Sequence, residues 1–201
     1  MTTFAEMQTE VIANTKRPEL VALTDSAIKM ATLRAHHVDF FPRDVGNSLL
    51  TYTVPSGNEL WVDVPTIFTT IPTLRTPDWI QGEDATTFVP NENLEYVVDF
   101  KNFWDEYNCI RSSVFTLMGD TLRIRCLSPT GRARFFYYKN PIVTSVGYSS
   151  WIADMHKEEL AKWAAAIVWM RSGFQEIAAQ MSGTITDFKS LLVESYLSSK
   201  V

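Results

Sequence analysis

The chain has 201 residues, a formal net charge of −5 and a pI of about 5.2, with 46% apolar and 20% charged residues. This length fits one domain, or one domain with a sizeable insertion, and the apolar fraction is sufficient for a packed core. An acidic chain is not expected to coat nucleic acid, although a local basic patch is compatible with this charge. Cys109 and Cys126 lack metal-type spacing and are too few for a disulfide framework, so we expect reduced core thiols.

Residues 1–8 contain neither a basic start nor an apolar run, so we expect no secretion signal. No segment approaches the length of a membrane span. We therefore expect a protein that is made and folded in a cytoplasm and that has no membrane contact.

Two helices are predicted at the N-terminal end. Thr3 and Glu6 have the spacing of a capping box at the start of a helix over about residues 4–15. Pro18 suits the first position of a second helix, which an apolar stripe extends to about Val38. Pro42 then prevents helical continuation within residues 39–44 (DFFPRD), where the two phenylalanines must be buried beneath the helices or against a partner.

After this corner the apolar period changes from helical to alternating. Residues 50–54 and 60–64, separated by a turn at 55–58, predict one hairpin, and residues 114–127, with Gly119-Asp120 as the turn, predict another. A turn at 128–131 leads into residues 132–138, so we expect a meander of antiparallel strands. Prolines in residues 65–108 predict long loops there, and periodicity does not decide whether residues 94–98 form a strand or a helix.

The C-terminal part predicts one long helix followed by an arm. Ser149 or Ser150 suits the N-cap, and helical apolar spacing continues over residues 151–181 until Ser182-Gly183. The remaining residues fit a flexible arm that becomes ordered on a partner, although packing against its own domain is the alternative. The expected anchors of this arm are Ile185, Phe188, Leu191, Leu192, Tyr196 and Leu197.

These elements predict an α+β fold of three parts. Residues 1–45 and 149–182 are expected to form an antiparallel helical bundle, residues 46–148 an inserted antiparallel β meander with long loops, and residues 183–201 an extended C-terminal arm.

No motif for catalysis, metal binding or cofactor binding is present. His36 and His37, followed by Asp39, suggest a metal cluster at first sight. Adjacent residues on a helix point about 100° apart, so the two imidazoles are poorly placed to share one ion. We expect structural or solvated histidines and no enzymatic activity.

Four arginines form a basic pattern on the late strands. If residues 128–131 form a four-residue turn, Arg125 faces Arg134 across the hairpin, and like charges in that position are destabilising. The group therefore requires anionic partners, which are either DNA phosphates or carboxylates of this chain or of a neighbouring subunit. The candidate carboxylates are Glu83, Asp84, Glu92, Glu95 and Asp99. The four arginines are Arg123, Arg125, Arg132 and Arg134.

Several segments together resemble the head-to-tail adaptor (connector) proteins of short-tailed bacteriophages. They are residues 15–20 (TKRPEL), 39–44 (DFFPRD), 136–141 (FYYKNP) and 150–154 (SWIAD), with the alanine-rich helix that carries Gly173 and Glu176. The similarity covers about half of the chain and excludes residues 65–108.

The resemblance implies a ring of about twelve subunits beneath the capsid portal, with cyclic symmetry around a DNA channel. It implies that the C-terminal arm docks into the portal protein, that the opposite face receives the tail nozzle protein, and that no cofactor is needed. The location would be the head–tail junction of the virion, after assembly in the bacterial host cytoplasm. A fold-defining corner would comprise Phe40, Phe41, Pro42, Arg43 and Asp44, with Arg43 as an ion-pair donor.

Two other functions remain open. A carbohydrate- or receptor-binding tail module would use Trp61, Trp79 and Trp104 as stacking platforms. A hydrolase would need His36, His37 or Cys109 in a shared pocket.

Overall fold

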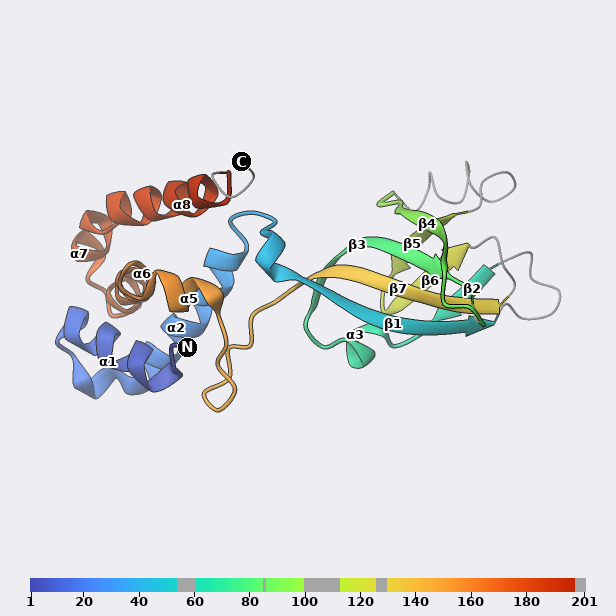
Figure 1. The fold of residues 1–201 in the computed structure, drawn as a ribbon. Helices are drawn as coiled ribbons and strands as arrows, with labels where there is room; N and C mark the ends of the chain where they lie inside the picture. The colour runs from blue at the N-terminus through green and yellow to red at the C-terminus, as the bar shows by residue number, and fades with distance from the viewer. Residues whose placement is uncertain (54–60, 85, 100–112, 126–129, 198–201) are drawn as a thin grey trace. The chain divides into compact units, whose positions relative to one another are not determined.

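The computed structural model describes the chain except for residues 54–60, 85, 100–112, 126–129 and 198–201 (Figure 1). It divides into two compact units. The helical unit comprises Met1–Asp44 and Asn140–Val201, and the sheet unit comprises Val45–Lys139.

The helical unit begins with the two helices that the sequence predicts. Helix α1 (Phe4–Thr15) has the expected capping box: Glu6 N donates to Thr3 Oγ1 at 3.2 Å, and Thr3 N donates to Glu6 Oε2 at 2.7 Å. A 3-10 turn, η1 (Pro18–Leu20), leads into α2 (Val21–His36). A second 3-10 turn, η2 (Pro42–Asp44), closes this part of the chain.

The prediction of one long C-terminal helix is wrong. The segment forms α5 (Trp151–Met155), α6 (Lys157–Arg171) and α7 (Gln175–Gln180), and Ser150 is the N-cap of α5 as expected. His156, with ψ 47°, separates α5 from α6, and Gly173, with φ 87°, lies in the turn between α6 and α7. Apolar side chains keep a helical spacing across His156 and Gly173, so the sequence pattern does not reveal these two breaks.

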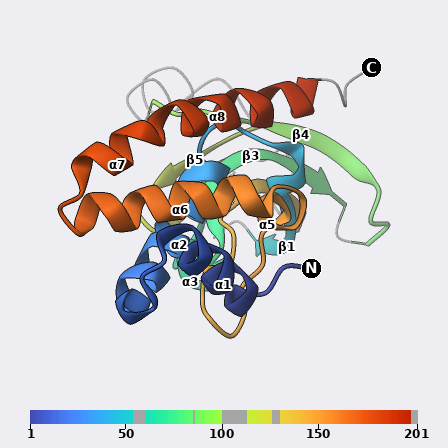
Figure 2. The same ribbon diagram turned by 90° about the vertical axis from the view of Figure 1, so that its left-hand side faces the viewer.

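The expected extended arm is a helix instead. Helix α8 (Ser182–Leu197) begins at the serine and glycine that were expected to end the preceding helix. Helix α6 contacts α1, α2, α7 and α8, and Figure 2 shows α8 on the side of α6 opposite to α1 and α2. Their shared core includes Met7, Ile28, Leu160, Phe188 and Leu192. The C-terminal segment therefore contributes to the core of its own unit.

The sheet unit contains seven strands in the order β1-β7-β3-β4-β5-β6-β2. Their bounds are β1 (Val45–Thr53), β2 (Trp61–Val64), β3 (Leu74–Glu83), β4 (Pro90–Tyr96), β5 (Val114–Met118), β6 (Thr121–Arg125) and β7 (Thr130–Lys139), with a short helix α3 (Ile67–Thr70) after β2. The sheet curls around its own core, which includes Leu50, Ile80, Leu94, Phe115 and Phe135 (Figure 1). Residues 94–96, left open from the sequence, belong to strand β4.

The predicted fold of a helical bundle with an inserted antiparallel meander is therefore wrong. The sheet is a core element of an α+β protein, and it is mixed because β4 and β5 run parallel, with Glu95 opposite Val114. The hairpin of β5 and β6 is confirmed, with Met118 opposite Thr121 and Gly119 at φ 59° in the turn. The other two expected hairpins are absent among the described strands, because β1 pairs with β7 and β2 pairs with β6.

The segment predicted as long loops contributes the ten-residue strand β3 to the middle of the sheet. Pro77 in β3 has no amide hydrogen for a ladder hydrogen bond, and the register with β7 shifts between Pro77 and Trp79. The pairs between β3 and β4 begin at Ile80, so Pro77 lies in a part of β3 that is paired with β7 alone among the described strands. None of the described helices is both long and apolar enough to cross a membrane.

Candidate functional site

The corner predicted to define the fold contains a buried polar network, which we call the corner network: His36, Asp44, Ser150 and Trp151. His36 Nδ1 lies 2.8 Å from Asp44 Oδ1, and His36 Nε2 lies 2.9 Å from Ser150 Oγ. Trp151 Nε1 donates to the same Asp44 oxygen at 2.8 Å. The network joins the end of α2, the turn η2 and the start of α5.

The order carboxylate, imidazole, hydroxyl is also the order of a catalytic triad. Here Ser150 Oγ additionally accepts the Ala153 N–H at 3.2 Å as the N-cap of α5. His36, Asp44 and Ser150 are all buried, so the hydroxyl is covered from solvent in this conformation. This arrangement supports a structural role: its hydrogen bonds hold the end of α2, the turn η2 and the start of α5 together.

The histidines occupy separate environments. His37 is exposed, and its Nε2 lies 2.9 Å from Asn140 Oδ1, whereas His36 faces the corner network. Cys109, the third residue of the hydrolase hypothesis, lies outside the described residues. Within the described part of the chain, no group of three or more His, Cys, Asp or Glu residues could hold a metal ion.

The two phenylalanines of the corner differ in burial. Phe41 is buried and contacts Trp151 edge to face, with ring centroids 5.3 Å apart, whereas Phe40 is 47% exposed. The guanidinium of Arg43 lies over the Trp151 ring at 5.4 Å, and its Nη1 lies 2.7 Å from Met155 Sδ. The expected carboxylate partner of Arg43 does not occur among the described ion pairs.

Helix α8 has one buried face and one exposed face. Phe188 and Leu192 are buried, and the Phe188 ring contacts Trp163 edge to face with centroids 6.3 Å apart. Ile185 is partly buried against the same core, whereas Leu191 is 43% exposed. The expectation that these anchors have no place in their own domain is therefore wrong for Phe188 and Leu192. Tyr196 and Leu197 lie in α8, but their side chains are outside the described part of the structure.

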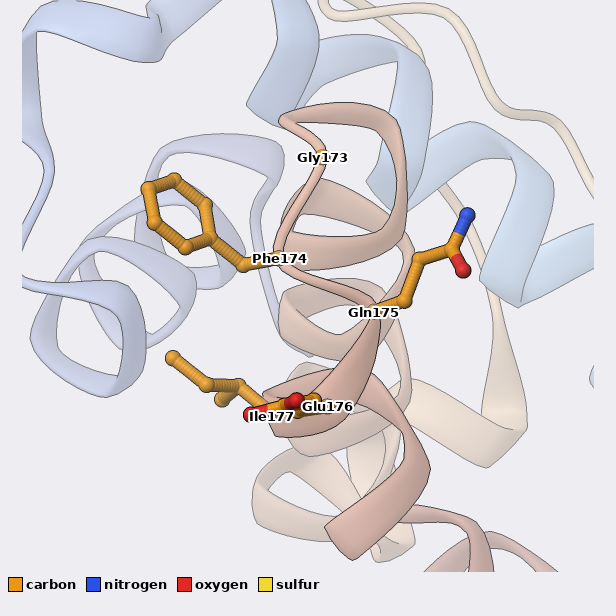
Figure 3. A pocket seen from close by; sticks show the side chains of 5 residues that line it. All are labelled: Gly173, Phe174, Gln175, Glu176 and Ile177. Carbon is orange, nitrogen blue, oxygen red and sulfur yellow. The ribbon is translucent and has the colours of Figure 1, made fainter.

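Two shallow grooves are formed by described residues of the helical unit. One, of about 410 Å³, is formed by Gly173–Ile177 at the turn into α7; Phe174 and Ile177 point to one side of this turn and Gln175 to the other (Figure 3). The other, of about 530 Å³, is lined by Arg34, His37, Val38, Trp163 and Lys189, and the Lys189 ammonium lies 5.1 Å from the Trp163 ring centroid. Neither groove was predicted from the sequence. The groove at Gly173 depends on a turn that the apolar pattern did not indicate, and the groove at Trp163 joins residues that are distant in the sequence.

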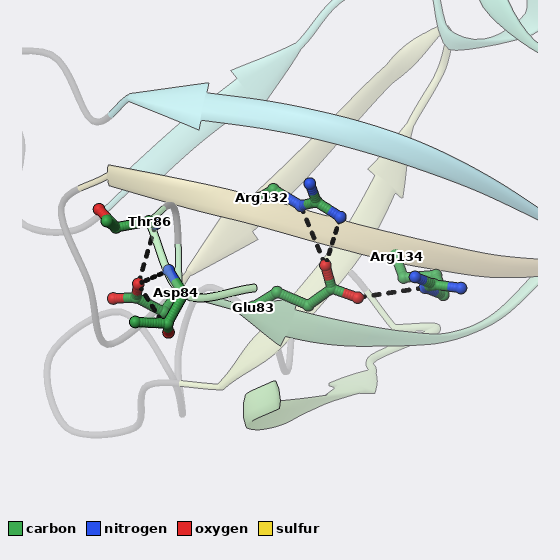
Figure 4. Close-up of polar contacts among 6 residues, drawn as sticks. Glu83, Asp84, Thr86, Arg132 and Arg134 are labelled. Carbon is green, nitrogen blue, oxygen red and sulfur yellow. Dashed lines mark hydrogen bonds and ion pairs between the residues drawn. The ribbon is translucent and has the colours of Figure 1, made fainter. Parts of the chain in front are cut away.

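Carboxylates of the sheet unit pair with Arg123, Arg132 and Arg134. Buried Glu83 accepts from Arg132 Nε at 3.0 Å and from Arg134 Nε at 3.2 Å (Figure 4). Asp63 accepts two hydrogen bonds of 2.7 Å from Arg123, and the hydrogen bonds and charge of this guanidinium lower the pKa of Asp63. These pairs match the intrachain alternative that the sequence left open beside DNA phosphates.

The predicted facing of Arg125 and Arg134 is wrong. Arg134 lies opposite Leu49 and Gln81, while Arg125 lies opposite Trp61 and Val114 and is buried. Glu83 was one of several carboxylates considered as partners. Its place opposite Arg132 follows from the pairing of β3 with β7, for which the sequence has no local signal.

Of the three tryptophans proposed as stacking platforms, only Trp79 has a described side chain. Its ring stacks on Phe136 with centroids 4.2 Å apart and planes 2° from parallel, so one ring face is already covered. The Trp61 side chain and all of Trp104 lie outside the described residues.

No model of a known protein family matches this chain, and no curated protein matches it.

Proposed function

We propose that this chain is a structural virion protein, the head-to-tail adaptor of a short-tailed bacteriophage. It forms a ring of about twelve copies with cyclic symmetry. The ring joins the capsid portal to the tail nozzle and leaves a channel for DNA. In this proposal the chain acts at the head–tail junction of the virion after assembly in the host cytoplasm, and it performs no catalysis and needs no cofactor. The support from the sequence is the resemblance over both chain ends and the late strands.

The main support for the proposal is that α8 has one buried side and one exposed side that carries an apolar residue. Its inner side is anchored by buried Phe188 and Leu192, while Leu191 between them presents an apolar side chain to solvent. A helix held in this way offers an apolar anchor to a groove of another protein. We therefore propose that α8 docks into the portal protein as a folded helix, with Leu191 as an anchor.

The exposed side chains at the end of α6, in the turn after it and in α7 support a second contact area. Met170, Phe174 and Ile177 are apolar and exposed, and the last two line the groove of Gly173–Ile177. Aromatic residues and methionine are enriched at the centres of protein interfaces. We propose that this area contacts a neighbouring subunit or the portal.

Ion pairs within the chain make these arginines weaker candidates for contact with DNA in the channel. Glu83 and Asp63 neutralise part of the charge of Arg132, Arg134 and Arg123. Arg134, whose side chain is 43% exposed, is the member of the Glu83 pair that we propose for a nonspecific phosphate contact.

Native mass measurement and electron microscopy with the portal protein of the same virus test the proposal. We expect a ring of adaptor copies on the portal. The change Leu191→Glu should reduce portal binding at least tenfold, because a carboxylate replaces an apolar anchor, whereas Val146→Glu, at a fully exposed position of the same unit, should have no effect. A stable monomer that does not bind portal protein would contradict the proposal.

A further inference from the structure

The strand order leaves two edges on the sheet, β1 and β2, and they differ in character. In the described part of the sheet unit, β1 pairs only with β7 and β2 only with β6. Strand β1 (VGNSLLTYT) has nine residues without a charge or a proline, and Leu49 on it is 51% exposed. Edge strands of this length usually carry lysine, proline or a bulge, because such features prevent pairing with another chain. Strand β1 therefore has the character of an edge that receives another strand.

The directions of the two edges follow from the ladders between them. Five neighbouring pairs are antiparallel, namely β1/β7, β7/β3, β3/β4, β5/β6 and β6/β2, and only β4/β5 is parallel. An odd number of reversals separates the edges, so β1 and β2 run in opposite directions. When two copies lie side by side in a ring, rotation about the ring axis preserves the direction of each strand relative to that axis. Strand β1 of one copy would therefore meet β2 of the next copy in the antiparallel sense.

The side chains at the two edges also match. On the core side, Leu50 and Tyr52 of β1 and Val62 of β2 belong to the same apolar core. Edge-to-edge pairing would place these core-side residues of adjacent copies on the same face of the joined sheet. On the other side, Leu49 and Thr51 are exposed and Asp63 of β2 is directed away from the core. A pairing between unlike edges is heterologous and generates a closed ring when the rotation permits.

We propose that the occupant of the β1 edge is strand β2 of a second copy of this chain, so that the sheets of adjacent subunits join edge to edge around the ring. This inference rests on the proposed ring, and it assigns the subunit contact to named strands. The contact is a backbone ladder limited by the four residues of β2, Trp61–Val64.

Disulfide trapping in the assembled ring tests this proposal in a background with Cys109→Ser and Cys126→Ser. Directly opposite residues of an antiparallel pair have Cα atoms about 4.5–5.5 Å apart, which lies within the range of about 4.4–6.8 Å that a disulfide bond spans. We expect the double variants Leu49→Cys/Asp63→Cys or Thr51→Cys/Asp63→Cys to form a ladder of covalent multimers on a denaturing gel after mild oxidation. The single variants should remain monomeric on the same gel.

The same assay distinguishes pairing of β1 with β2 from pairing of β1 with another strand. Covalent dimers from Leu49→Cys or Thr51→Cys alone would indicate that two β1 strands pair about a twofold axis, and would overturn the proposal. A ring visible by electron microscopy that yields no covalent ladder with either double variant would overturn it as well, while the adaptor function would stand. Failure to form any ring, with or without portal protein, would overturn both.

A charge at the edge provides an independent test. Leu49→Lys should weaken ring assembly at least tenfold, because an edge lysine opposes strand addition. The matched control is Val98→Lys, at an exposed position of the same unit that lies outside the strands. Unchanged assembly of Leu49→Lys, with circular dichroism like that of the unmodified chain, would overturn the proposal.

Discussion

His36 and Asp44 are joined by a contact of 2.8 Å between Nδ1 and Oδ1 in the buried interior of the helical unit. The carboxylate also accepts from Trp151, and the other imidazole nitrogen faces Ser150. One buried network therefore ties the end of α2 to the start of α5. Asp44 from residues 39–44 and Ser150 and Trp151 from residues 150–154 therefore meet in one buried network.

Removal of the Ser150 hydroxyl is expected to destabilise the helical unit. Ser150→Ala removes the N-cap of α5 and leaves Nε2 of buried His36 without this partner. We expect a loss of about 1–3 kcal/mol in the free energy of unfolding. Urea denaturation followed by circular dichroism measures the loss. The control is Ser149→Ala at the neighbouring position, which should change the unfolding free energy by less than about 0.5 kcal/mol.

Neutralising Glu83 is expected to destabilise the sheet unit. Glu83→Gln leaves Arg132 and Arg134 without the carboxylate that they share. Because both guanidinium groups retain partial access to solvent, we expect a loss of about 1–3 kcal/mol, less than for a fully buried ion pair. Chemical denaturation checks this value, and Glu176→Gln, at an exposed carboxylate of α7, serves as the control.

The same variant tests the proposed DNA contact. With one negative charge fewer beside two arginines, Glu83→Gln should bind duplex DNA more tightly than the unmodified chain at low salt, and added salt should remove the difference. The assembled ring is the sample for this measurement. Equal affinity at all salt concentrations would contradict a DNA contact by Arg134.

The pairing of Asp63 with Arg123 predicts a pH dependence of stability. Hydrogen bonds from Arg123, followed by its charge, hold the pKa of Asp63 below the ordinary value. A carboxylate with a lowered pKa in the folded state stabilises the protein above its unfolded pKa and loses this effect as the pH falls through its folded pKa. We expect Asp63→Asn to lose about 0.5–1 kcal/mol near neutral pH, since the side chain is partly exposed. The difference from the unmodified chain should vanish as the pH falls below the ordinary aspartate pKa of about 3.9. A difference that persists in acid would show that packing, not charge, is responsible.

The turn between α6 and α7 is expected to require glycine. Gly173 has φ 87°, a left-handed conformation that strains any residue with a Cβ, although no neighbouring atom would obstruct that Cβ. Gly173→Ala should lower the free energy of unfolding by about 1 kcal/mol or more. Gly183→Ala is the matched control, because it lies in α8 without a left-handed φ and should be neutral or stabilising by up to about 1 kcal/mol. Thermal unfolding of both variants measures this contrast.

Features that depend on neighbouring residues could be predicted from the amino-acid sequence. The capping box of Thr3 and Glu6, the N-cap at Ser150 and the turn at Gly119 each involve residues a few positions apart. Their hydrogen bonds and backbone angles depend on nearby residues, so residue type and spacing are sufficient to predict them. Helix α1 and the hairpin of β5 and β6 were found for this reason.

Features that depend on distant residues could not be predicted in this way. Strand β7 lies between β1 and β3, and Arg132 is 49 positions from Glu83. An alternating apolar pattern indicates that a strand has a buried face, but it does not indicate which strand lies beside it. The expected hairpins joined neighbours in the chain, whereas burial of the shared core selects β1 with β7 and β2 with β6.

The C-terminal segment shows both limits. Its apolar spacing indicated that Phe188 and Leu192 are covered by some surface, and both side chains are buried in the core of the helical unit. Whether that surface belongs to the same unit or to a partner depends on the shape of the core around Trp163, which forms only when α1, α2 and α6 come together. Residue types thus establish which side chains leave water, and the packing of distant helices establishes where those side chains go.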